Sequence, residues 1–188
     1  ELADENYASN PINRCYFCRV EMYDTLGEVA QKHNLPYVID GFNFSDMGDY
    51  RPGRKAANER QVRSPLYEAK LTKDEIRFLA KEIGLPNWDR PASACLSSRI
   101  PYGMRVTVDK LKQIDEAERF IHSLGIKQVR VRHHENIARI EVEVQELPKL
   151  TQPDIHQQVV DRLQALGFAY VTLDLKGYRT GSLNEELE

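Results

Sequence analysis

The sequence contains little cysteine and no long apolar run. Only three of its 188 residues are cysteines, namely Cys15, Cys18 and Cys95. Three thiols cannot all pair within one chain, so a closed disulfide framework is excluded and a reducing, cytoplasmic environment is expected. No apolar run approaches the roughly 18 residues of a membrane span, so we do not expect a membrane protein. The acidic, polar start of the chain is not typical of a signal peptide.

An excess of one charge is also missing. The net charge is −3 and the isoelectric point is about 6.0, which counts against general binding to nucleic acid. Hydrophobic residues make up 41% and charged residues 29% of the chain, as in ordinary soluble globular proteins. A length of 188 residues suits one large domain or two small ones.

The chain does have a C-x-x-C pair and a distant third thiol. A helix predicted from Asn10 to about His33 would place Cys15 and Cys18 on one face. Three thiolates are one short of a four-cysteine iron–sulfur site, and a cluster held in this way keeps one iron open. A zinc site, a redox pair and buried structural thiols are the alternatives. Three histidines could complete a zinc site, although none has a zinc-finger spacing: His33, His133 and His134.

The first half of the chain has the pattern of a parallel α/β domain. After the first helix, a short apolar run over 37–39 predicts a buried strand. A long polar loop over 42–54 follows, and loops of this length inside compact domains are often functional. Thr72 and Glu75 have the spacing of a capping box, and they open a helix that Gly84 ends. We place a domain boundary in the break at 86–91.

The second half predicts the order strand, helix, strand, strand, helix, strand. Alternating apolar and polar residues over 128–132 and 138–144 favour a hairpin. A weak strand at 105–107 and a last strand at 170–175 complete the set, which is the order of a ferredoxin-like unit. The predicted domains are therefore residues 1–90 and 91–188.

Two arginines of this half are candidates for anion binding. Arg130 and Arg132 fall on one face of a predicted strand, because side chains two apart point the same way. Two adjacent guanidinium groups suit a phosphate or a carboxylate. The alternative is a solvated face that pairs with Glu141 and Glu143 across the hairpin.

Several motifs together resemble those of one family. They are C-x-x-C at 15–18, D-G-x-N at 40–43, D-Y-R-P-G at 49–53, the segment 95–103 and the segment 130–141. On these motifs the chain resembles the LarE family, ATP-dependent sulfur transferases that make the nickel-pincer cofactor of lactate racemase. LarE proteins are PP-loop ATP pyrophosphatases. The resemblance implies an α/β fold: the later part of a PP-loop (adenine nucleotide alpha hydrolase-like) parallel-sheet domain over 1–90, then a ferredoxin-like α+β domain over 91–188 for substrate and sulfur transfer.

The resemblance also implies a reaction. ATP, with Mg, adenylates a carboxylate of a pyridinium dicarboxylate mononucleotide, and sulfide displaces AMP to give a thiocarboxylate. Cys15, Cys18 and Cys95 would hold a [4Fe–4S] cluster that carries the sulfide. The arginines implied to hold the substrate's phosphate or carboxylates, and to act with Cys95 in catalysis, are Arg99, Arg130 and Arg132.

Asp49 and Arg51 lie on the loop after the predicted strand that ends at Asp40 and Gly41. In a parallel α/β sheet such loops lie at the carboxyl edge, where ligands bind, so we expect both residues near the nucleotide or substrate. Glu118 and Glu141 match acidic family positions associated with metal binding, and surface salt bridges are the alternative. The family tends to form homo-oligomers.

Two departures from the family pattern matter. The phosphate loop S-G-G-x-D-S is absent, so we expect it upstream of residue 1 and expect an incomplete ATP site in these residues. Some members sacrifice a cysteine that would align with Ala94, whereas this chain carries Cys95 one place later. The chain therefore resembles the three-cysteine branch. A cluster-dependent tRNA-thiolating PP-loop enzyme and a zinc- or cluster-stabilised binding module without catalysis are the alternatives.

Overall fold

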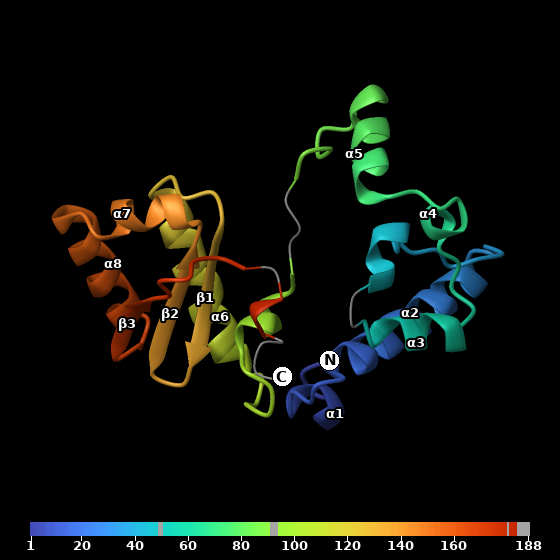
Figure 1. The fold of residues 1–188 in the computed structure, drawn as a ribbon. Helices are drawn as coiled ribbons and strands as arrows, with labels where there is room; N and C mark the ends of the chain where they lie inside the picture. The colour runs from blue at the N-terminus through green and yellow to red at the C-terminus, as the bar shows by residue number, and fades with distance from the viewer. Residues whose placement is uncertain (49–50, 91–93, 180, 184–188) are drawn as a thin grey trace. The chain divides into compact units, whose positions relative to one another are not determined.

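A computed structural model describes residues 1–48, 51–90, 94–179 and 181–183, which form two compact units (Figure 1). The first unit takes in residue 1, residues 3–7 and the chain from Pro11 up to the break before Ala94. The second takes in residue 2, residues 8–10 and the chain from Ala94. No helix in the described ranges has the length and apolar character needed to cross a membrane.

Helices make up the ordered elements of the first unit. After the short α1 (Glu5–Ala8), they are α2 (Arg14–Lys32), the 3-10 helix η1 (Phe44–Gly48), α3 (Gly53–Glu59), α4 (Pro65–Glu68) and α5 (Lys73–Glu82). Helix α2 packs against α3, and buried Tyr23, Ala56 and Ala57 form a small core between them. The predicted capping box is confirmed, because Thr72 and Glu75 exchange both hydrogen bonds at the start of α5.

Two predictions for this unit are wrong. Residues 37–39 form only one parallel bridge, between Ile39 and Arg63, and Ile39 is 64% exposed. A buried parallel strand needs neighbours on both sides, and a single bridge does not supply them. Helix α2 begins at Arg14 and not at Asn10, whose backbone is left-handed with φ of 57°. The Asn10 amide instead donates to the carbonyl oxygens of Ile100, Pro101 and Met104.

The second unit contains a three-stranded sheet with helices beside it (Figure 1). Its elements are the 3-10 helix η2 (Leu96–Arg99), α6 (Val108–Ser123), β1 (Val129–His134), β2 (Ile137–Val142), the 3-10 helix η3 (Val144–Glu146), α7 (Leu147–Leu150), α8 (Pro153–Ala165) and β3 (Tyr170–Leu173). Strands β1 and β2 form the predicted antiparallel hairpin. Strand β3 joins the other side of β2 in parallel, after a crossover through α7 and α8.

The predicted strand at 105–107 is wrong. Thr107 instead caps α6, because its hydroxyl accepts a hydrogen bond from the Lys110 amide at 3.3 Å. A side chain that caps a helix competes with strand pairing. The described residues of the second unit therefore contain three strands of the four expected there, and the ferredoxin-like order is not confirmed.

Side-chain alternation separates the two faces of the hairpin. Val129 and Val131 of β1, with Ile140 of β2, join a buried apolar cluster with α6 and α8. The intervening residues face the other way. Arg130, Arg132, Glu141 and Arg139 therefore share the opposite face, and this polar face carries most of the candidate site.

Candidate functional site

The three cysteines are accessible. Cys15 and Cys18 lie in the first turns of α2, where Cys15 is exposed and Cys18 is half-buried. The Cys18 thiol donates a hydrogen bond to a Glu1 carboxylate oxygen at 3.2 Å. Cys95 is exposed at the start of η2, and no disulfide involves any of the three. The alternative of buried structural thiols is therefore wrong.

The donor set suits a soft metal. Two exposed or half-exposed thiols three residues apart on one helix can turn toward a common ligand, and thiolates favour iron–sulfur clusters or zinc. Cys15 and Cys18 belong to the first unit and Cys95 to the second. Within the described ranges, no group of three or more His, Cys, Asp or Glu side chains is already gathered as a metal site.

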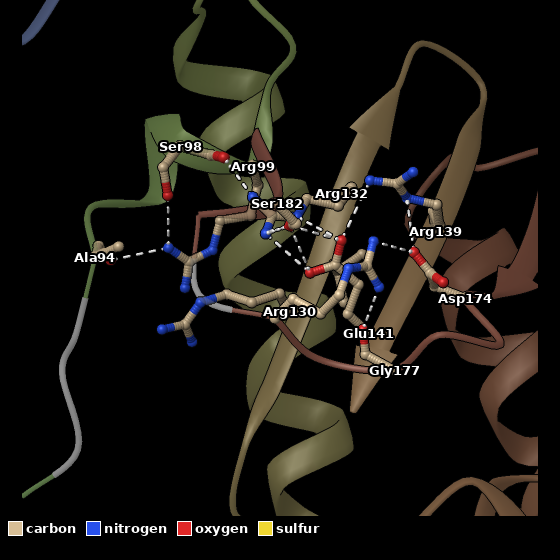
Figure 2. A network of polar contacts seen from close by, with 12 residues as sticks. Ala94, Ser98, Arg99, Arg130, Arg132, Arg139, Glu141, Asp174, Gly177 and Ser182 are labelled. Atoms are coloured by element: carbon tan, nitrogen blue, oxygen red, sulfur yellow. Dashed lines mark hydrogen bonds and ion pairs between the residues drawn. The ribbon is translucent and has the colours of Figure 1, made fainter. Parts of the chain in front are cut away.

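Arg99 holds the segment that carries Cys95. It is 2% exposed, and its Nε and Nη2 donate to the two Glu118 carboxylate oxygens at 2.8 and 2.9 Å. Its Nη1 donates to the Ala94 carbonyl oxygen at 2.8 Å (Figure 2). The same Nη1 donates to the Cys95 carbonyl oxygen at 2.9 Å. Glu118 also accepts the Val131 amide at 2.9 Å. Arg99 thus ties the Cys95 backbone to α6 and β1.

Arg132 forms a second buried pair on the sheet. Its Nε and Nη2 donate to Glu141 at 3.0 and 2.8 Å, and Glu141 is fully buried. Its Nη1 donates to the Ser98 carbonyl oxygen at 2.7 Å, and Ser182 bridges the pair (Figure 2). The predicted pairing of the arginines with Glu141 is confirmed for Arg132, but the pair is buried where a solvated one was expected. Glu143 is exposed, and the strand ends before it.

Arg130 lies beside these pairs. Its Nη1 donates to the Val129 carbonyl oxygen at 2.9 Å, and its guanidinium carbon lies 5.4 Å from the centre of the Tyr178 ring. Burial, and next the positive charge of Arg99, lower the pKa of Arg130 below its ordinary value. An anion bound beside this guanidinium would raise its pKa again and so oppose both effects.

Arginines and carboxylates alternate in a network on the polar face. Among the described residues, the network joins five arginines and three carboxylates. The members are Arg99, Arg130, Arg132, Arg139 and Arg179 with Glu118, Glu141 and Asp174. The sequence did not identify four members of this network, namely Arg139, Asp174, Arg179 and Ser182. The position of Arg139 directly opposite Arg132 in the hairpin was the available signal, because like charges that face each other need a shared anion.

A second polar chain runs through the first unit. The Tyr23 hydroxyl and the Ser64 hydroxyl donate to the two oxygens of Asp40 at 2.9 and 2.6 Å. Ser64 accepts in turn from Arg54 Nη1 at 2.9 Å. Burial, and next the bond to Asp40, raise the pKa of Tyr23 to about 12. The acidic residue of the D-G-x-N motif therefore holds Arg54, which sequence reasoning missed, in place.

Arg54 lines a groove of the first unit. The groove has a volume of about 450 Å³ and is lined by Arg51, Arg54, Asp46, Phe42, Met47 and Tyr67, among others. Gly53 precedes Arg54 and lies against α2, so that a Cβ there would be 2.7 Å from Arg19 Cγ and 3.4 Å from the Cys15 carbonyl oxygen. Of the two loop residues predicted near the nucleotide or substrate, Arg51 lies in this groove and Asp49 lies outside the described residues.

Three curated proteins resemble the chain over most of its length. An uncharacterised protein of Synechocystis is 49% identical over 187 residues, which is 100% of this chain and 70% of the relative. An uncharacterised protein of Methanocaldococcus jannaschii is 31% identical over 173 residues, 91% of this chain and 66% of the relative. No family model matches the chain.

The third relative has a functional name. Pyridinium-3,5-bisthiocarboxylic acid mononucleotide synthase of Lactiplantibacillus plantarum is 42% identical over 189 positions, 99% of this chain and 67% of the relative. The chain thus spans about two thirds of the length of the relatives that it matches. An identity of 42% along essentially the whole chain shows that it belongs to the LarE family, that of pyridinium-3,5-bisthiocarboxylic acid mononucleotide synthase.

Proposed function

We propose that the chain takes part in sulfur transfer to a pyridinium dicarboxylate mononucleotide, converting carboxylates into thiocarboxylates for a nickel-pincer cofactor. The cluster of arginines that the polar face holds in fixed positions, next to the segment that carries Cys95, is the observation that carries this proposal. A substrate with a phosphate and two carboxylates needs such a surface. The name of the Lactiplantibacillus relative supports the same product class.

The arginines divide into two roles in this proposal. Arg130 and Arg132 come from one face of β1. Arg130 would bind the phosphate or a carboxylate directly, whereas Arg132, which Glu141 and the Ser98 carbonyl oxygen engage, would contribute its positive charge to the same site. Arg99 is better suited to positioning than to direct binding, because Glu118 and two backbone carbonyl oxygens engage it. By holding the Cys95 carbonyl oxygen, Arg99 would fix where the thiol is presented.

Cys15, Cys18 and Cys95 are proposed to bind a [4Fe–4S] cluster. Bound there, the cluster would supply an iron with an open position that can hold sulfide in its deprotonated, nucleophilic form. ATP with Mg would activate the carboxylate by adenylation, and Arg51 would lie near the nucleotide or substrate. A cytoplasmic location and a homo-oligomeric state belong to the same proposal.

Metal analysis of protein purified without oxygen tests the proposal first. We expect about four irons and matching acid-labile sulfide per chain. A protein that also carries the phosphate loop expected upstream of residue 1 is then incubated with ATP, Mg, sulfide and the dicarboxylate mononucleotide, and mass spectrometry should detect the gain of sulfur for oxygen. One zinc per chain without iron, or no thiocarboxylate from iron-loaded protein, would overturn the proposal.

A single substitution separates the cluster from the fold. Cys18→Ala should abolish iron loading and repeated thiocarboxylate formation together, because two thiolates do not complete the ligand set. Thr25→Ala is the matched control, since Thr25 is an exposed residue of the same helix. Unchanged multiple-turnover activity in Cys18→Ala would contradict the assigned ligand role.

A further inference from the structure

The groove of the first unit holds a guanidinium in a fixed position. The Arg54 guanidinium carbon lies 4.2 Å from the centre of the Phe42 ring and 4.9 Å from that of the Tyr67 ring. Those two rings contact each other, with centres 5.4 Å apart. Stacking on two rings and the bond from Nη1 to buried Ser64 together restrict the side chain. Arg54 therefore needs little further ordering to bind a ligand.

The same guanidinium has hydrogen-bond donors available for a ligand. An arginine has five N–H donors, and among the described residues Arg54 donates only through Nη1, to Ser64. Its Nε and Nη2 together form an edge that matches the two oxygens of a carboxylate. Arg51 also lines the groove, where its guanidinium pairs with Asp46 at 2.7 Å. The polar partner of Arg54 is the neutral Ser64 hydroxyl, so Arg54 is the guanidinium of the described lining that suits a further anion.

The walls of the groove are apolar and planar where they approach this charge. Phe42 and Tyr67 supply ring surface, and Met47 supplies a flexible thioether that is 59% exposed. A small inorganic anion would gain nothing from such walls, whereas a flat ring would bury its surface against them. A cavity of about 450 Å³ is in the range of small-molecule sites and accommodates one substituted ring.

We propose that this groove binds a planar aromatic carboxylate, with the carboxylate on the edge of Arg54 and the ring against Phe42 and Met47. The inference rests on the proposed function, in which such a ring is the part of the substrate that changes. The close packing of Gly53 on the Cys15 carbonyl oxygen joins the groove to the turn that carries the thiol pair. The groove thus determines which part of the substrate lies beside that turn.

Binding of pyridine-3,5-dicarboxylate to the full chain, followed by calorimetry, tests the inference. Glutarate, inorganic phosphate and AMP are the comparison probes. The aromatic probe should bind at least about tenfold more tightly than glutarate, which has two carboxylates but no ring. Equal binding of the two dicarboxylates, or preferential binding of phosphate or AMP that depends on Arg54, would overturn it.

Matched variants locate the binding. Arg54→Lys keeps the charge but loses the fork, and it should weaken binding of the aromatic probe about tenfold. Arg63→Lys is the control, because Arg63 also lies over a ring, that of Tyr37, but outside the groove. An equal loss in both variants, with the fold retained by circular dichroism, would contradict the assignment.

A second pair of variants avoids the buried network. Met47→Glu places a negative charge on an exposed lining residue, and it should weaken binding about fivefold through repulsion of the anion. Ile83→Glu adds the same charge at the C-cap of α5, where Ile83 is 73% exposed and outside the groove, and it should leave binding unchanged. Unaltered binding in Met47→Glu would overturn the inference.

These measurements use neither ATP nor sulfide, so they separate the inference from the proposed function. Binding that depends on Arg54, without any sulfur transfer by a protein that also carries the upstream phosphate loop, would refute the proposed function alone. Sulfur transfer, together with binding of the aromatic probe that is unchanged in Arg54→Lys and Met47→Glu, would refute the groove assignment alone.

Discussion

Replacing Glu141 with glutamine is expected to destabilise the second unit strongly. Glu141 is fully buried and accepts hydrogen bonds from Arg132 at 3.0 and 2.8 Å and from Arg139 at 3.2 Å. Glutamine has nearly the same shape but no charge, and its amide group presents donors to guanidinium groups that are themselves donors. The substitution therefore removes one acceptor and leaves Arg132 buried without its counter-charge.

The size of the effect follows from burial. The Arg132 side chain is 8% exposed and that of Glu141 is 0% exposed, so solvent does not screen the pair. Breaking a buried pair by removing one partner costs about 3–5 kcal/mol. For a unit of fewer than a hundred residues, the smaller of these values lowers the midpoint of thermal unfolding by at least about 12 °C.

Calorimetry of the full chain, with hydrogen exchange of peptides from β1 and β2, would measure the loss. Glu116→Gln is the matched control, because Glu116 pairs with Arg162 at 3.0 Å in the same unit but both side chains are about half exposed. An exposed pair contributes about 0–1 kcal/mol, so the control should hardly move. A loss below about 1 kcal/mol in Glu141→Gln would refute the claim that this buried pair organises the sheet face.

Two further predictions concern packing and pH. Gly53→Ala should lower the free energy of unfolding by about 1–3 kcal/mol, because its Cβ would lie 2.7 Å from Cγ of Arg19. Gly27→Ala is the control, since Gly27 has open space around it in α2, and it should stabilise the helix by about 1 kcal/mol. Equal effects of the two substitutions in urea denaturation would contradict the close contact at Gly53. Burial lowers the pKa of His133 below its ordinary value of 6.5, so the unfolded chain takes up the proton first as pH falls. The free energy of unfolding should therefore decrease as the pH drops below about 6.5, and above that pH His133 should have no effect on it. Urea denaturation of His133→Gln at several pH values checks the assignment, because this variant should lack the decrease due to His133.

Local patterns were read correctly from the sequence. The capping box at Thr72 and Glu75 and the helix end at Gly84 depend on residues three or four positions apart, so the sequence contains the whole signal. The hairpin is local in the same sense, since alternation and a short polar link specify it. The wrong strands at 37–39 and 105–107 are different, because a strand exists only when another segment pairs with it.

The site was predictable to a smaller extent. Alternation placed Arg130 and Arg132 on one face, and the structure retains them there. The sequence did not reveal that Glu141, directly opposite Arg130, would pair with Arg132 on the diagonal. That choice depends on Arg139, which lies opposite Arg132 and needs the same carboxylate. Pairwise reading of a hairpin does not capture a carboxylate shared by two arginines.

The buried carboxylates explain how a positively charged face can exist within a folded unit. Arginines buried together repel one another, and each loses hydration that water would otherwise supply. Glu118 and Glu141 each fix one guanidinium by two hydrogen bonds, which stabilises the fold and sets the geometry at once. Burial, and next the positive charge of Arg99, lower the pKa of Arg130, as expected for guanidinium groups held close together. The two carboxylates thus set the geometry of the face before any ligand binds, which lowers the ordering cost of binding an anion there.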